Sequence, residues 1–222
     1  MAQLILATQA QGGDAEIFAS LQGEGPSAGQ PVAFIRLSRC NLACIWCDTA
    51  YTWRFDDTKP HNGSEVFERK ANQIALDPKV AAERILALGQ KRLIITGGEP
   101  LLQGPALADM LAQLPDMQVE IETNGTVKAP SHVDIRVDQY NVSPKLAHSG
   151  NPAEQALVEE RLDYYASDPR AFFKFVIAAP DDVDEVLTLQ AKYRFKSGHV
   201  YLMAEGTDSA CLLYTSPSPR DS

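Results

Sequence analysis

Three of the chain's four cysteines, Cys40, Cys44 and Cys47, lie within eight residues in the spacing C-x3-C-x2-C. A disulfide joins two thiols and needs a specific geometry, so three thiols in so tight a loop indicate a metal or cluster site. Three thiolates are one ligand short of the set that closes a structural zinc site. A cubane iron–sulfur cluster held by three thiolates keeps one iron open for a non-protein ligand, and the spacing favours this chemistry.

A zinc site is the alternative. Cys40, Cys44, Cys47 and His61 could supply three thiolates and one imidazole, although zinc sites usually separate their ligand pairs by about a dozen residues. An electron-carrier cluster normally has a fourth thiolate nearby, whereas Cys211 lies in a Ser/Pro-rich stretch at the C-terminus. A non-catalytic zinc or iron–sulfur binding module therefore stays open as a second class of function.

The composition bounds the class of protein. A chain of 222 residues that is 45% hydrophobic and 22% charged is expected to form one soluble globular domain. Its net charge of -9 disfavours binding to nucleic acid. The sequence has no apolar run long enough for a membrane span. Its N-terminus lacks the charged segment with which a signal peptide begins. With its clustered thiols, the chain is predicted to be cytoplasmic, without nucleic-acid or membrane partners.

Apolar runs bounded by Gly, Pro, Asn and Asp predict strands that alternate with helices. About six strands could all run parallel, so the predicted fold class is α/β, with a sheet that is open or curled toward a barrel. Residues 1–13 are predicted to be a frayed lead-in, and 51–76 a polar excursion with one short helix from Ser64. The expected strands are 16–21, 32–37, 92–96, 118–123, 140–142, 172–178 and 199–203. One expected helix begins at Pro78 and ends at Gly89, and a second begins at Pro105. Two further helices are expected over 151–166 and 181–192.

Polar and glycine-rich segments follow the carboxyl ends of nearly all these strands. In addition to the cysteine loop, these segments are 96–99, 122–125, 143–145 and 205–207. The carboxyl ends of parallel strands meet at one edge of a sheet, where α/β proteins bind their ligands. The sequence therefore predicts one site that spans several strands.

Two of these segments resemble those of a known superfamily. The cysteine loop, with Trp46 directly before the last cysteine, is similar to the signature of the radical S-adenosylmethionine (SAM) superfamily, and Gly97-Gly98-Glu99-Pro100 to its glycine-rich motif. The resemblance implies an incomplete (β/α) barrel. It also implies a [4Fe-4S] cluster on Cys40, Cys44 and Cys47, whose open iron is chelated by the amino and carboxylate groups of SAM.

Further motifs resemble one family in this superfamily, the 7-carboxy-7-deazaguanine synthases of queuosine and deazapurine biosynthesis. The matching segments are 16–25, 34–37, 47–49, 95–100, 122–126, 142–145 and 173–175. The resemblance implies a carbon–nitrogen lyase that acts on 6-carboxy-5,6,7,8-tetrahydropterin. A 5′-deoxyadenosyl radical abstracts hydrogen from C6, the ring contracts with loss of ammonia, and the adenosyl radical is regenerated. Magnesium, an electron donor such as flavodoxin, and a homodimer are implied as well. An activating enzyme that makes a glycyl radical on a partner protein is the alternative within the superfamily.

The resemblance also assigns the site residues. No side chain is expected to be catalytic, since the radical is generated on SAM. Thr49 is expected to bind magnesium, a hard ion that prefers oxygen ligands. The expected SAM-binding residues are Trp46, Asp48, Gly98, Glu99, Ser143, Pro144 and Lys145. The expected substrate-binding residues are Leu21, Gln22, Gly23, Arg36 and Thr96.

Several of these residues also have ordinary structural explanations. Residues 22–26 could be a plain connecting turn, and Asp48 could cap the turn after the cysteines. Arg36 suits a carboxylate through its planar guanidinium, but it could be a surface charge. Lys145 could be a solvated loop lysine.

Residues 1–207 are expected to form a single radical SAM domain, truncated at its C-terminus. Residues 208–222 are expected to be a disordered, non-native tail, because this Ser/Pro-rich stretch begins abruptly where another helix is expected. As family members continue past this point, we expect the chain as written to bind its cluster yet turn over slowly.

Overall fold

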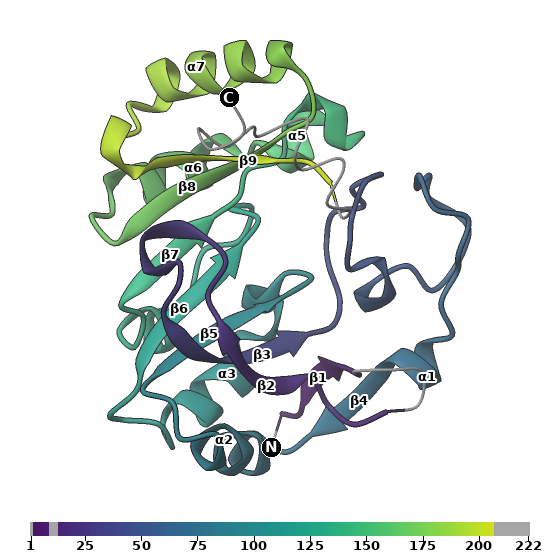
Figure 1. Ribbon diagram of the computed structural model, residues 1–222, viewed down its shortest axis with the longest axis vertical. Coiled ribbons are helices and arrows are strands. Elements are labelled where there is room, and N and C mark those ends of the chain that lie inside the picture. The colour runs from purple at the N-terminus through teal and green to yellow at the C-terminus, as the bar shows by residue number, and fades with distance from the viewer. Residues whose placement is uncertain (1, 9–12, 207–222) are drawn as a thin grey trace, which may run out of the picture.

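The computed structural model describes residues 2–8 and 13–206, and in this part of the chain nine strands form one sheet (Figure 1). The order of the strands is β4-β1-β3-β5-β6-β7-β8-β9, and β2 pairs with β3 beside this path. The strands are β1 (Leu4–Ala7), β2 (Ile17–Leu21), β3 (Pro31–Leu37), β4 (Gln73–Leu76), β5 (Arg92–Gly97), β6 (Gln118–Thr123), β7 (Gln139–Val142), β8 (Ala171–Ile177) and β9 (Val200–Ala204).

Six strands, β3 and β5 to β9, are parallel neighbours in chain order. The α/β class and the six parallel strands are therefore confirmed. β4 and β9 stand at the two ends of the strand order, so the sheet is open, as an incomplete barrel requires. Expected strand 16–21 is present as β2, but it runs antiparallel to β3.

Seven α-helices lie between these strands in the described residues. They are α1 (Arg69–Asn72), α2 (Pro78–Ala87), α3 (Gly104–Leu111), α4 (Ser131–Asp134), α5 (Ala153–Ala156), α6 (Glu159–Ser167) and α7 (Pro180–Tyr193). The predicted start of α2 is confirmed: the Asp77 side chain accepts a hydrogen bond from Lys79 N, and Pro78 occupies the first helical turn. None of the described helices is long and apolar enough to cross a bilayer.

The two faces of the sheet differ because side chains alternate along a strand. On one face, Ile35, Ile95 and Ile121 belong to the main core together with apolar side chains of α2, α3, α6 and α7. On the other face, Arg36 and Thr96 occupy neighbouring positions of β3 and β5 and line a cavity. One face of the sheet thus carries the core, and the other carries the polar groups of the site.

Some local expectations were wrong. Residues 4–7 form β1 instead of a frayed lead-in, because they pair with β4 and bury Leu4 and Leu6. The short helix in the 51–76 excursion is α1, which begins at Arg69 instead of Ser64. The expected helix 151–166 is two helices, because Leu157 and Val158 leave helical geometry between α5 and α6. The predicted tail 208–222, with Cys211, lies outside the described residues.

The backbone approaches itself closely at the carboxyl end of β5. Gly97 has φ +131, and a Cβ there would overlap the backbone of Leu37. A Cβ on Gly98 would overlap the carbonyl of Arg39, whose oxygen accepts the Glu99 N–H at 2.9 Å. Only glycine allows this approach, which holds the start of the cysteine loop against the Gly97-Gly98 turn.

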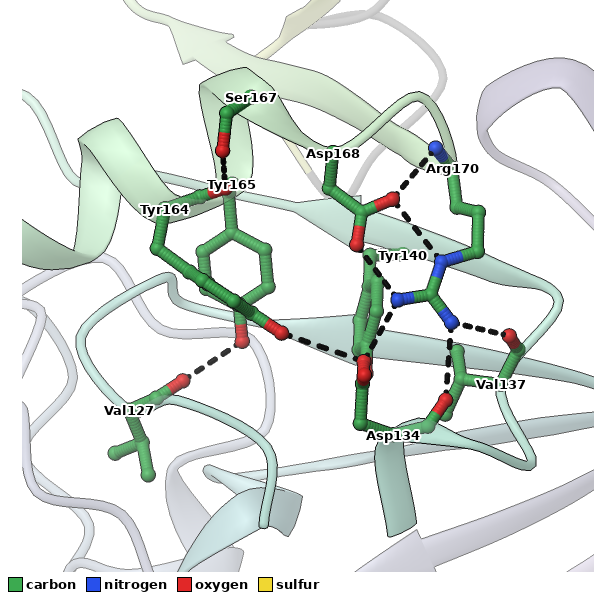
Figure 2. A network of polar contacts seen from close by, with 9 residues as sticks. All are labelled: Val127, Asp134, Val137, Tyr140, Tyr164, Tyr165, Ser167, Asp168 and Arg170. Atoms are coloured by element: carbon green, nitrogen blue, oxygen red, sulfur yellow. Dashed lines mark hydrogen bonds and ion pairs between the residues drawn. The ribbon is translucent and has the colours of Figure 1, made fainter. Parts of the chain in front are cut away.

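A polar network joins α4, α6, β7 and β8 near the amino-terminal ends of these strands (Figure 2). Arg170 Nη2 lies 2.7 Å from both Asp134 Oδ1 and Asp168 Oδ2. Arg170 Nη1 donates to the carbonyls of Asp134 and Val137, each at 2.9 Å. Tyr140 Oη donates to the same Asp134 oxygen at 2.6 Å. One guanidinium therefore ties the segments 134–137 and 168–170 together at the edge of the core opposite the carboxyl ends of the strands.

Replacing Arg170 should destabilise the fold in a pH-dependent way. Arg170→Gln is expected to lower the free energy of unfolding near pH 7 by about 2 kcal/mol, since hydrogen bonds to charged groups are lost. Burial opposes ionisation of Asp168, but hydrogen bonds from Arg170 outweigh it and lower the pKa of this carboxyl below 3.8. The difference between variant and parent should thus be complete above about pH 4 and shrink as the pH falls through the lowered pKa.

Urea unfolding at several pH values measures this difference. Arg161→Gln is the matched control, because Arg161 pairs only with the exposed Glu160 in the described structure and such pairs contribute about 0–1 kcal/mol. Equal effects of the two substitutions at pH 7 would contradict the role given to Arg170.

Gly98→Ala should destabilise the protein by about 3 kcal/mol, because the added methyl group must displace the Arg39 carbonyl. Gly198→Ala is the control, as its added Cβ would have no heavy atom within 4 Å, and it should change stability by less than about 0.5 kcal/mol. Thermal unfolding of both variants checks this prediction, and a Gly98→Ala protein as stable as the control would refute it.

Candidate active site

A cavity of about 400 Å³ opens among the carboxyl ends of the parallel strands. It brings together thirteen of the sixteen predicted site residues. They are Gln22, Gly23, Arg36, Cys40, Cys44, Trp46, Cys47, Asp48, Thr49, Thr96, Gly98, Ser143 and Lys145. Residues more than 100 positions apart in the sequence thus share one cavity, as the strand-end pattern predicts.

Leu21, Glu99 and Pro144 do not line this cavity. Leu21 is 61% exposed on β2, and Pro144 is buried. Glu99 is fully buried. In this structure the Glu99 carboxylate therefore does not face the cavity.

The Glu99 carboxylate instead organises the strand ends. It accepts hydrogen bonds from Leu101 N at 3.1 Å, Asn124 N at 2.8 Å and Thr123 Oγ1 at 2.9 Å. Burial raises the pKa of Glu99 to about 7, while these hydrogen bonds and the Lys145 charge oppose the shift. Glu99 therefore joins the ends of β5 and β6 beneath the cysteine loop.

The three thiols are free and lie on the same cavity wall. Burial raises the pKa of Cys40 to about 12, and the nearby Glu99 carboxylate and the other thiols add to this shift. Metal ions replace thiol protons when they bind, so the raised pKa of Cys40 does not prevent this residue from serving as a thiolate ligand. The donor set thus fits an iron–sulfur cluster.

His61 is engaged elsewhere. Its Nε2 lies 3.0 Å from the carbonyl oxygen of Cys47, and its Nδ1 accepts the N–H of Gly63 at 2.9 Å. Both ring nitrogens have protein partners, so this geometry does not support the alternative zinc site with His61 as fourth ligand.

The Lys145 side chain lies beside Trp46 on the cavity wall. Its Nζ donates to Ser143 Oγ at 2.7 Å and lies 5.6 Å from the centre of the Trp46 rings. Burial lowers the pKa of Lys145, and the positive charge of Lys174 adds to this effect. In the described structure no carboxylate pairs with Lys145, so a bound anionic group would stabilise its charge. This geometry does not support the alternative of a solvated loop lysine.

Arg36 is part of a partly buried polar cluster and is not a free surface charge. Its Nε lies 2.6 Å from Glu16 Oε2, and Tyr51 Oη donates to the same carboxylate at 3.0 Å. The guanidinium is held by Glu16, the residue just before β2, and Arg36 also lines the cavity.

Several polar cavity residues were not among those predicted from the sequence. Lys174 Nζ lies 2.8 Å from Glu24 Oε2, and Gln22 Nε2 donates to Glu122 Oε1 at 3.1 Å. Burial and the Glu24 charge raise the pKa of Glu122, while Lys174 opposes the shift. Strand alternation could have found Glu122 and Lys174, since each is a polar residue on a buried strand that also carries apolar side chains.

Thr49 lies at the end of the cysteine loop, with its Oγ1 3.6 Å from Cys47 Sγ. Its neighbour Asp48 is exposed yet lines the cavity. The hydroxyl and the carboxylate are oxygen groups suited to a hard cation.

Comparison with known proteins agrees with this geometry. Residues 34–148 match the radical SAM superfamily. The chain is 38% identical over 190 residues to the 7-carboxy-7-deazaguanine synthase of Pyrobaculum aerophilum, covering 85% of this chain and 77% of that protein. It is 36% identical over 191 residues to the same enzyme of Hyperthermus butylicus, covering 85% and 74%.

The crystal structure of QueE from Escherichia coli has the same fold. The two structures superpose with a TM-score of 0.65 at 23% identity, covering 96% of this chain and 88% of that one. The family match implies a [4Fe-4S] cluster and SAM as cofactors, and the three cysteines of the required spacing are present. The extent of these matches shows that the chain belongs to the 7-carboxy-7-deazaguanine synthases, carbon–nitrogen lyases of the radical SAM superfamily.

Proposed function

We propose that the cavity binds SAM beside the cysteine loop and 6-carboxy-5,6,7,8-tetrahydropterin beside β2, β3 and β6, with Mg²⁺ at Thr49. The observation that carries this proposal is the shared cavity: three free thiols, the Thr49 hydroxyl and the side chains of Arg36 and Lys174 all line it. A cluster, an anionic substrate and a hard cation would then meet in one place.

The cysteine loop would hold the cluster through Cys40, Cys44 and Cys47. When bound, the cluster supplies an electron for the reductive cleavage of SAM. The Lys145 ammonium and the Ser143 hydroxyl offer a charge and a donor to the SAM carboxylate, and the Trp46 ring offers a flat apolar surface to its adenine. The backbone at Gly98 is free of a side chain that would cover the cluster wall.

The polar side chains at β2, β3, β6 and β8 suit a carboxylated pterin. Arg36 and Lys174 are the cations available for the substrate carboxylate. Gln22 and Glu122, already hydrogen-bonded to each other, offer donors and acceptors to the edge of the pterin ring, and Thr96 adds a hydroxyl. Gly23 leaves backbone groups open to the ring. Gln22 and Thr96 are buried, which limits the water that would compete for their hydrogen bonds.

The Thr49 hydroxyl would hold magnesium at the end of the cysteine loop, where the ion would offset the negative charge of the substrate carboxylate. Mg²⁺ usually keeps several waters and takes few protein ligands, so a single hydroxyl with Asp48 nearby is sufficient to position it. This role would also explain why a threonine follows so soon after the cluster motif.

The remaining features of the proposal concern the setting of the enzyme. We propose that it works in the cytoplasm as a homodimer, takes electrons from a donor such as flavodoxin, and forms one domain over residues 1–207.

Anaerobic incubation of reconstituted protein with SAM, dithionite, Mg²⁺ and the carboxytetrahydropterin tests the site. Mass spectrometry should detect 7-carboxy-7-deazaguanine. Release of 5′-deoxyadenosine without that product would contradict the proposed substrate site.

Thr49→Val should uncouple substrate turnover from cofactor cleavage. The substitution keeps the volume of the side chain but removes the oxygen, so the stimulation by Mg²⁺ should fall at least about tenfold, or about 1.4 kcal/mol. Iron content and uncoupled SAM cleavage should stay at the parent level. Steady-state product formation with and without Mg²⁺ measures the effect.

Thr49→Ser should restore the stimulation by Mg²⁺, because it retains the hydroxyl. Thr188→Val on α7 is a matched control: Thr188 is exposed, and its hydroxyl bonds only to the Asp184 carbonyl within the described structure. Full Mg²⁺ dependence in Thr49→Val would exclude Thr49 as the metal-binding residue.

A further inference from the structure

Each of the three thiols accepts a side-chain N–H from outside the cysteine motif. Asn124 Nδ2 lies 3.9 Å from Cys40 Sγ, and the other two contacts are shorter. Asn151 Nδ2 lies 3.3 Å from Cys44 Sγ, and Trp53 Nε1 lies 3.3 Å from Cys47 Sγ. Both distances are within the hydrogen-bond range for sulfur. Cys40 Sγ accepts the backbone N–H of Leu42 at 3.4 Å.

The orientation of the Asn151 amide follows from its other contacts. Its Oδ1 accepts the backbone N–H of Ala43 at 2.9 Å, so its Nδ2 must turn toward Cys44. Nδ2 also lies 3.2 Å from Ser149 Oγ, and the Ser149 carbonyl accepts Ile45 N–H at 3.0 Å. The segment 149–151 thus lies along the cysteine loop and aims an N–H at its second thiol.

Trp53 is held in a similar way from the other side. It follows the 3-10 segment Ala50–Thr52, and its backbone N–H bonds to the Ala50 carbonyl. Its ring packs edge-on against His61, at 6.2 Å between centroids, and His61 itself bonds to the Cys47 carbonyl. The indole can donate through Nε1 alone, and that atom faces Cys47 Sγ.

Hydrogen bonds to cluster sulfurs change the reduction potential. Reduction adds negative charge, which spreads onto the thiolates. An N–H donor stabilises that charge more in the reduced state than in the oxidised state, so it raises the potential. A higher potential makes the cluster easier to reduce by a biological donor.

We propose that Asn151 and Trp53 are positioning residues that donate hydrogen bonds to the cluster thiolates of Cys44 and Cys47 and raise the reduction potential of the cluster. Neither residue was among the predicted site residues, and Asn151 does not line the cavity. The inference rests on the assignment of the cluster to these cysteines. The inference gives Asn151 and Trp53 a role through their contacts with the thiolates, which is separate from the binding of SAM and substrate.

The test uses the full chain with its cluster reconstituted anaerobically. Trp53→Phe retains an aromatic ring without the N–H, and Asn151→Leu retains the branched shape without a donor or a charge. Each variant should shift the reduction equilibrium about tenfold toward the oxidised cluster, which lowers the midpoint potential of a one-electron couple by about 59 mV. A redox titration that follows the electron paramagnetic resonance signal of the reduced cluster measures this shift.

Tyr51→Phe is the control, because its hydroxyl donates to Glu16 and not to a thiol. Its potential should equal that of the parent. If a variant fails to take up iron, 3-benzothienyl-alanine at position 53 decides the test, since it keeps the bicyclic ring and replaces only the N–H by sulfur. It should lower the potential as Trp53→Phe does.

Parent potentials in Trp53→Phe, or in the benzothienyl protein, at parent iron content would overturn the inference. Resonance Raman spectra offer a second readout: iron–thiolate stretching frequencies should rise when the N–H donor is lost, and unchanged frequencies would also overturn it. Failure of the parent chain to bind a cluster would instead count against the cysteine site itself, so the two failures can be told apart.

Discussion

The close approach of two strand ends is the constraint on which the site depends. The Gly97-Gly98 turn lies directly against the backbone of Leu37 and Arg39, and the buried Glu99 carboxylate bonds to the end of β6. These contacts set the start of the cysteine loop relative to β5 and β6. A buried carboxylate is costly unless it is hydrogen-bonded, and Leu101 N, Thr123 Oγ1 and Asn124 N supply these hydrogen bonds.

The polar face of the sheet follows from the same arrangement. Strand alternation sends one set of side chains into the core and the other into the cavity. On the cavity side, charges occur mostly in pairs, such as Arg36 with Glu16 and Lys174 with Glu24. Paired groups hold fixed positions before any ligand arrives, which reduces the entropy lost on binding. Lys145 has no such carboxylate partner among the described residues, so a bound anion would stabilise its charge.

The cysteine loop is supported from both sides by segments outside the motif. Asn151 contacts it 107 residues after Cys44, and Trp53 and His61 contact it from the excursion that follows. The excursion has little regular structure, yet it supplies donors and packing around three thiols. Long irregular segments in compact domains often carry function for this reason.

The sequence by itself determined the chemistry and the order of the elements. The cysteine spacing, the GGEP turn and the polar residues after each strand are local signals, because each depends on neighbours a few positions away. They predicted the six parallel strands and most of the cavity wall. The tertiary structure alone decided the rest. β1 and β4 are four-residue strands that depend on pairing with each other, and Glu99 turned inward because its partners lie on β6 and its loop. The contacts of Asn151 and Trp53 with the thiols also had no local signal, since a hydrogen bond between separate segments leaves no spacing in the sequence.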